Sequence, residues 1–302
     1  MNTRFTMQKL QTRFSQRGMG LVELMISMVI GLILLGTLTY FYLGSRQISR
    51  THDDLSRMEE SGRNAMEIIG KAVRQAGFRL DVKRALYVNP ANNIGAMVGT
   101  DGGGVAFGAT GAATAPSDTL TIRHDPTWIA HVTNPIKGKE ANCATVGPND
   151  MESNNDVNTT TGAIPLNTMV VEYAFSINPA SAGLFCNSNA SNPAAGGSII
   201  VDNIERMQIT YGLRDATGAV TIYLPAAAAG VAATVPPTSV ATAAQFAQVA
   251  AVRVSLLVRG PSNGITANNS QTYTFNGETV TSTDGFLRQV YTSTFTVRNQ
   301  AL

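Results

Sequence analysis

The residues from Met19 to Leu43 form an uninterrupted apolar run of 25 residues in which Glu23 is the only charged side chain. As a helix, the run would be about 38 Å long, which exceeds the roughly 30 Å hydrocarbon core of a bilayer. A secretory signal peptide has an apolar region of about 7–15 residues and an A-x-A-like cleavage site. This run is longer and no such site follows it, so it predicts a retained membrane anchor. An ionised residue in a membrane span costs about 2.5–3.5 kcal/mol or more, so we expect Glu23 to have a partner and a function.

The segment before the apolar run carries all of the positive charge excess of the chain. It contains no acidic residue and four basic ones, namely Arg4, Lys9, Arg13 and Arg17. Subtracting this +4 from the net charge of +2 for all 302 residues leaves −2 for residues 19–302. Positive charge before a span predicts a cytoplasmic N-terminus. A weakly acidic remainder lacks the basic face that nucleic-acid binding needs, so no nucleic-acid partner is expected.

The helical pattern continues beyond the apolar run but becomes amphipathic. Apolar or small residues recur at spacings of three, four or seven, which places them on one face of a helix. They are Ile48, Leu55, Met58, Gly62, Ala65, Ile69, Ala72 and Ala76. Gly77 is suited to the left-handed conformation that often ends a helix. The sequence therefore predicts one helix over about residues 19–76, whose second half packs one face against a globular body.

The rest of the chain has the alternation of β-strands separated by loops rich in Gly, Ala and Asn. The predicted strands are 119–124, 169–177, 207–213, 219–224, 252–259 and 289–297. In the strand 252–259, Val252, Val254, Leu256 and Val258 are expected to face the core and Leu257 the opposite side. An Ala-rich segment favours a short helix around residues 241–250. The predicted fold class is α+β, with a long N-terminal helix packed on a mainly antiparallel β-sheet.

The residues around the start of the apolar run carry a family resemblance. The stretch from Gln16 to Leu24, QRGMGLVEL, resembles the class III signal of type IV prepilins. The resemblance implies that a prepilin peptidase cuts between Gly18 and Met19 and methylates the amino group of Met19. Glu23 then becomes the fifth residue of the mature chain, and the terminal amine of an adjacent subunit would be its partner. Such a buried ion pair would offset the cost of the carboxylate in lipid.

Further segments narrow the resemblance to PilW-type minor pilins. They are RQAGF at 74–78, SDTLTIR at 117–123, IERMQITYG at 204–212, VRVSLLVR at 252–259 and LRQV at 287–290. The resemblance implies the pilin fold and four parts. These are a cleaved leader at 1–18, a transmembrane and filament-core helix at 19–45, an amphipathic helix at 46–77 and a periplasmic β-rich head at 78–302.

The family implies a minor pilin that primes type IV pilus assembly, enters the filament and supports twitching motility and surface attachment. Its implied partners are the prepilin peptidase, other minor pilins, the major pilin, the inner membrane and a tip adhesin. The implied location is the inner membrane, as a single-pass protein with a periplasmic head, and then the pilus on the cell surface. The N-terminal signal also fits a J-type minor pseudopilin of type II secretion. Neither a minor pilin nor a pseudopilin is expected to have an enzyme activity or a cofactor.

The chain has two cysteines, Cys143 and Cys186, which the resemblance places in the periplasm. A disulfide is favoured in an oxidising compartment and would contribute about 3–4 kcal/mol in the chain-entropy model. Two buried free thiols are the alternative, and we favour the disulfide. With two cysteines and three histidines, the chain offers little material for a metal centre.

Three local patterns suggest chemistry but have stronger structural explanations. Residues 260–264, GPSNG, match the G-x-S-x-G nucleophile elbow, yet no helix is predicted after them and no histidine follows Ser262. We therefore expect a hairpin loop there. His124 and Asp125 are expected to be a strand end rather than an acid–base pair. The acidic positions in 150–161 resemble the start of a calcium loop but lack its glycine and its final glutamate, which favours a solvated loop.

Overall fold

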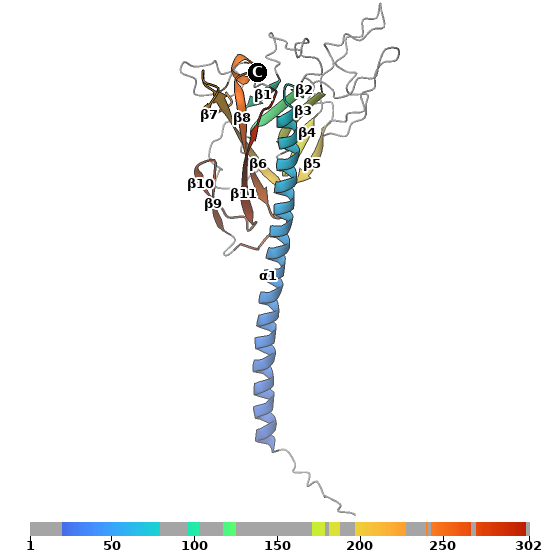
Figure 1. Ribbon diagram of the computed structural model, residues 1–302. Helices are drawn as coiled ribbons and strands as arrows, with labels where there is room; N and C mark the ends of the chain where they lie inside the picture. Colours follow the sequence, from blue (N-terminus) through green and yellow to red (C-terminus); the bar gives the residue numbers. More distant parts are fainter. Residues whose placement is uncertain are drawn as a thin grey trace, which may run out of the picture. The chain divides into compact units, whose positions relative to one another are not determined.

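The computed structural model describes residues 20–78, 96–102, 117–124, 171–178, 181–187, 197–227, 240, 243–266 and 270–299. The chain divides into two compact units, Met1–Ser49 and Arg50–Leu302. We call them the stem unit and the globular unit and describe each by itself. Both contribute to the helix α1, Leu21–Gln75 (Figure 1).

The helix α1 begins and ends close to the predicted positions. The Gly20 carbonyl accepts hydrogen bonds from the amides of Glu23 and Leu24, at 3.0 and 3.2 Å, and so starts the helix. At the other end Gly77 has a φ of 71°, and its amide donates to the Arg123 carbonyl at 2.9 Å. Glycine adopts this left-handed conformation without the penalty that a Cβ brings. Gly77 therefore ends the helix and fixes its end to a strand.

In the globular unit, two larger sheets and a hairpin are built from antiparallel strand pairs (Figure 1). The five-stranded sheet has the order β1-β2-β3-β4-β5 and the four-stranded sheet the order β11-β8-β6-β7. The strands of the first are β1 Met97–Thr100, β2 Thr119–His124, β3 Val171–Asn178, β4 Gly183–Asn187 and β5 Ser198–Asp202. Those of the second are β6 Ile204–Arg214, β7 Val220–Pro225, β8 Val249–Arg259 and β11 Arg288–Thr296. The hairpin is β9 Gln271–Phe275 with β10 Glu278–Ser282.

Ser117 and Asp118, which precede β2, join the five-stranded sheet to β6. The Asp118 amide donates to the Met207 carbonyl at 3.0 Å, and the Met207 amide donates to Ser117 Oγ at 2.7 Å. The Asp118 carboxylate accepts a hydrogen bond from the Ile209 amide at 2.7 Å. The backbone groups of Met207 and Ile209 in β6 therefore find their partners in the backbone and side chains of Ser117 and Asp118, as buried polar groups require.

The part of α1 within the globular unit packs closely on β11. A Cβ at Gly62 would lie 2.8 Å from the ring of Tyr291, and a Cβ at Gly70 would overlap the ring of Phe295. The two glycines thus make room for two aromatic rings, and Ala65, which lies between them, is fully buried. The predicted long helix on antiparallel sheets is confirmed.

Several predictions about the buried faces were wrong. Ile48 and Leu55 were expected on the buried face of α1, but they are 61% and 38% exposed, and Asp54 is buried instead. Leu257, expected to face outward, is also buried. It is paired with Arg206, whose guanidinium lies 5.4 Å from the ring centre of Phe275 in the hairpin, so the hairpin covers this part of the sheet.

The predicted helix around 241–250 is shorter than expected. The helix α2 covers Ala243–Phe246 only, and β8 already begins at Val249. Val249 and Phe246 are both buried, so core packing determines where the Ala-rich segment changes from helix to strand.

Candidate functional site

Glu23 lies in the first turn of α1, on an exposed surface of the stem unit. A carboxylate near a helix N-terminus is favoured by the helix dipole, and here it stands among apolar neighbours. Leu21 and Val22 are 77% and 68% exposed. Gly18 and Met19, the predicted processing residues, lie outside the described residues.

The apolar side chains of the stem unit are exposed over its whole described length. Their exposure ranges from 52% at Ile30 to 83% at Tyr40. The segment is long and apolar enough to cross a membrane, by length and composition. A continuous apolar surface of this size on a single helix requires either lipid or other helices around it.

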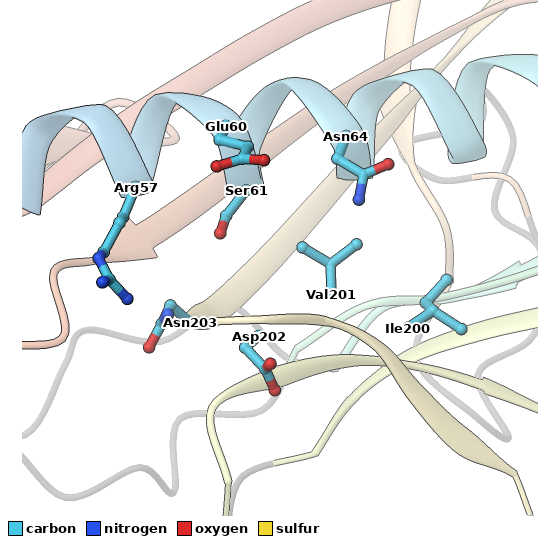
Figure 2. Close-up of a pocket in the computed structure, with 8 residues that line it drawn as sticks. All are labelled: Arg57, Glu60, Ser61, Asn64, Ile200, Val201, Asp202 and Asn203. Carbon is cyan, nitrogen blue, oxygen red and sulfur yellow. The ribbon is translucent and has the colours of Figure 1, made fainter.

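In the globular unit, a groove of about 310 Å³ lies between α1 and the end of β5 (Figure 2). Polar side chains of α1 face the turn from β5 to β6 across it. The lining residues are Arg57, Glu60, Ser61, Asn64, Ile200, Val201, Asp202 and Asn203. Small-molecule sites are mostly apolar, so this mixed polar lining is more suitable for contact with another polar surface.

Buried ion pairs fix the strands of the globular unit around the core. Arg123 Nε lies 2.6 Å from Glu172 Oε2, which joins β2 to β3. Arg288 joins β11 to β6 through Glu205, with Nε to Oε2 at 2.6 Å and Nη2 to Oε1 at 3.0 Å. Sequence reasoning missed these pairs because the partners are 49 and 83 positions apart.

Asp118 is a buried carboxyl group whose pKa is shifted by its surroundings. Burial raises its pKa to about 6, and the nearby Asp101 adds to this, while hydrogen bonds from the amides of Ile209 and Gly102 act in the opposite direction. Between the unfolded value of 3.8 and about 6, the folded state binds more protons than the unfolded state. The contribution of Asp118 to stability therefore falls as pH rises through this range.

We expect the free energy of unfolding to lose up to about 1.4 kcal/mol per pH unit between pH 4 and 6 through this group. Asp118→Asn should remove that slope, which denaturant unfolding of the full chain in detergent micelles would measure. Asp202→Asn, at an exposed position, is the control. If wild type and Asp118→Asn differ by a constant amount across this range, the assignment to Asp118 is wrong.

Ser262, the serine of the G-x-S-x-G pattern, contacts a carboxylate directly. Its Oγ donates to Asp54 Oδ1 at 2.8 Å and its amide donates to Asp54 Oδ2 at 3.0 Å. A nucleophile elbow needs a general base that takes the serine proton, usually a histidine. In the described part of the chain, the hydroxyl serves instead to bind α1, in agreement with the predicted loop.

The remaining sequence patterns give no reactive cluster among the described residues. His124 is fully buried at the end of β2 and stacks on Tyr173 with ring centres 5.7 Å apart. Asp125 and the calcium-like segment 150–161 lie outside the described residues. Within the described part, no group of three His, Cys, Asp or Glu side chains could hold a metal ion.

Cys186 is fully buried in β4, where its sulfur is part of a disulfide. Cys143, the other cysteine of the chain, lies outside the described residues. The pairing of Cys143 with Cys186 therefore stays a prediction.

Without reductant, the purified protein should take up no alkyl groups under denaturing conditions, and it should take up two after reduction. Cys143→Ser should then lower stability by about 3–4 kcal/mol through the larger entropy of the unfolded chain. Mass spectrometry and denaturant unfolding measure the two effects. Alkylation of two thiols before reduction would contradict the pairing.

Two family models match separate parts of the chain. The prokaryotic N-terminal methylation motif matches residues 13–39, which include Gly18, Met19 and Glu23. The type IV pilus-assembly protein W family matches residues 173–299, from β3 to the end of β11. The two matches lie in the stem unit and the globular unit respectively.

Among solved structures, the chain is similar to a type IV-like pilin from Thermus thermophilus, with 13% identity and a TM-score of 0.35. The similarity covers 84% of this chain and 99% of that one. No protein of curated function matches the sequence.

Proposed function

We propose that the chain is a PilW-type minor pilin, which helps to prime pilus assembly in the inner membrane and then enters the filament. In this role it supports twitching motility and surface attachment. The matches of residues 173–299 to the type IV pilus-assembly protein W family and of residues 13–39 to the N-terminal methylation motif support this proposal. The observation that carries the proposal is the exposed apolar surface of the stem unit, with Glu23 in its first turn, within the methylation motif.

The proposal divides the chain into four parts with different tasks. Residues 1–18 are a basic leader that the prepilin peptidase removes, leaving N-methylated Met19. Residues 19–45 lie first in the bilayer and then in the filament core. Residues 46–77 connect this segment to the periplasmic head, residues 78–302.

Physical reasoning supports the passage from membrane to filament. Apolar helices exposed to lipid can exchange lipid contacts for contacts with one another, at little net cost in hydrophobic burial. The Glu23 carboxylate favours the filament over the membrane. It is costly in lipid without a cation, and in the filament the terminal amine of a neighbouring pilin stabilises it. Other minor pilins and the major pilin are therefore the proposed partners.

In this proposal the globular unit binds neighbouring subunits through its surface and catalyses no reaction. Its polar groove between α1 and β5 and its buried ion pairs suit a rigid module that presents a fixed surface to neighbouring subunits. The family is one of structural assembly proteins. We assign no catalytic step to the chain.

Deletion of the gene tests the proposal against the pseudopilin alternative. We expect loss of surface pili and twitching with exoprotein secretion unchanged, and restoration of both by the wild-type chain. Loss of exoprotein secretion with normal pili would contradict the proposal and select a type II secretion pseudopilin.

A further inference from the structure

The loop of residues 260–266, which follows β8, is attached to α1 by a buried carboxylate that the proposed function does not use. Asp54 is 2% exposed, although it lies on a helix face expected to be apolar. Both of its oxygens accept hydrogen bonds from Ser262, at 2.8 and 3.0 Å. Hydrogen bonds to a charged acceptor are among the stronger ones in proteins, so this contact is a strong local attachment.

The fit between the loop and the helix leaves no space for a larger residue at the first position of the loop. A Cβ at Gly260 would lie 2.7 Å from Asp54 Oδ2 and 3.3 Å from the sulfur of Met58. The glycine therefore allows the backbone to approach α1, and Ser262, two residues later, reaches the carboxylate. The contacts of Gly260 and Ser262 with α1 thus explain why the loop begins with the residues G-P-S.

The opposite side of the loop is held by the segment before β11. The Gly260 amide donates to the Leu287 carbonyl at 2.7 Å, and the Gly264 amide donates to the Gly285 carbonyl at 3.1 Å. The Ile265 amide donates to the same Gly285 carbonyl at 3.2 Å. The loop thus lies between α1 and residues 284–287 and is bonded to both.

Residues 284–287 are in turn anchored in the sheet by Arg288. Its side chain has no exposed surface and lies 2.5 Å from Asp284 Oδ2 and 2.6 Å from Glu205 Oε2. Because the Arg288 guanidinium is buried, removing either carboxylate leaves its charge less well compensated, which is unfavourable. A continuous series of polar contacts therefore leads from the helix, through the loop, to β6.

We propose that residues 260–266 form a strap that fastens α1 to the globular unit at Asp54, with Arg288 and Asp284 acting as its anchor. The strap holds the first turns of α1 within the globular unit, where Asp54 and Met58 lie. Regions of a protein open locally according to their own contacts, so loss of the strap should free these turns before the rest of the helix. Farther along, the packing of Gly70 against Phe295 holds α1 independently of the strap.

The test uses two cysteine reporters in the full chain in detergent micelles, with the native disulfide intact. Met58→Cys reports on the strap end of the helix and Ala72→Cys on the far end, and both positions are at most 2% exposed. The rate of thiol labelling under native conditions measures how often each position opens. Asp54→Asn, Ser262→Ala and Asp284→Asn are introduced into each reporter chain.

We expect Asp54→Asn and Ser262→Ala to speed labelling at position 58 by about tenfold to a hundredfold, and Asp284→Asn to speed it by less. Labelling at position 72 should stay within twofold. Asp53→Asn and Asn263→Ala are matched controls, since both residues are exposed neighbours of the strap pair, and they should leave both rates unchanged.

Unchanged labelling at position 58 in Asp54→Asn and Ser262→Ala would overturn the proposal. An equal increase at positions 58 and 72 would also overturn it, because that result indicates a general loss of stability. If Asp284→Asn alone leaves labelling at position 58 unchanged, the assignment of Asp284 to the anchor of the strap is wrong. The measurement involves no filament, so its outcome is separate from that of the proposed function.

Discussion

Glu23→Ala should reduce incorporation of the protein into sheared pili to a small fraction of the wild-type level while leaving leader cleavage intact. The carboxylate is the only charge in the apolar run, and a charge in lipid costs about 2.5–3.5 kcal/mol or more. Removing it makes the stem unit more stable in the membrane and removes the partner of a neighbour's terminal amine. Both effects favour the membrane over the filament.

Immunoblots of the sheared-pilus and membrane fractions measure incorporation, and the mass of the membrane form measures cleavage. Glu23→Gln separates charge from shape, because it keeps the size of the side chain and should fail in the same way. Asp53→Asn is the control for a carboxylate elsewhere on α1, since that side chain is exposed in the globular unit. Wild-type incorporation of Glu23→Gln would contradict the proposed ion pair.

Gly70→Ala should lower the stability of the globular unit by about 1–3 kcal/mol. In an exposed helix, replacing glycine by alanine gains up to about 1 kcal/mol. Here the added Cβ would overlap the ring of Phe295, with Cδ1 of the ring 2.8 Å away. Overpacking of a close contact costs more than the gain in helix propensity, so the sign is reversed.

Denaturant unfolding of the full chain in micelles measures this change. Gly44→Ala is the matched control, because no atom lies within 4 Å of a Cβ at that position. Phe295→Leu should restore part of the stability lost in Gly70→Ala by giving the new methyl group space. If Gly70→Ala is as stable as wild type, α1 does not pack on β11 as closely as the structure indicates.

The long helix and the strands with clear alternation could be predicted from the sequence because local patterns determine them. The apolar run, the spacing of small residues up to Ala76 and the terminal Gly77 give nearly the observed limits of α1. The alternation in 252–259 likewise identifies β8. In each case the pattern of hydrophobicity along the chain identifies the type of element, although it gave the wrong side for Leu257.

The contacts that hold these elements together could not be predicted in the same way. Leu55 was expected to be buried, and burial of Asp54 was not foreseen, because apolar spacing cannot indicate a carboxylate whose partner is 208 positions away. The pairing of Arg288 with Glu205 depends on a sheet order that brings β6 and β11 to either side of β8. Such polar contacts become visible only once the topology is known.

The hairpin of β9 and β10 is a different case, since its signal was present in the sequence. Asn276 and Gly277 form its turn with φ values of 52° and 83°, and Asn-Gly is a strong indicator of a two-residue hairpin. In the flanking strands threonine alternates with Tyr273 and Phe275 in β9 and with the buried Val280 in β10, so the strand pattern was present as well and the sequence analysis missed it. The hairpin contacts the four-stranded sheet where the Phe275 ring packs on the guanidinium of Arg206.

The central claim is that the chain is processed as a type IV prepilin and keeps its apolar helix. The N-terminal mass of the mature protein, purified from membranes or pili, tests it most directly. The account predicts a chain that begins at N-methylated Met19, with Glu23 as its fifth residue. A mature chain that begins after Leu43, or one that retains residues 1–18, would contradict it.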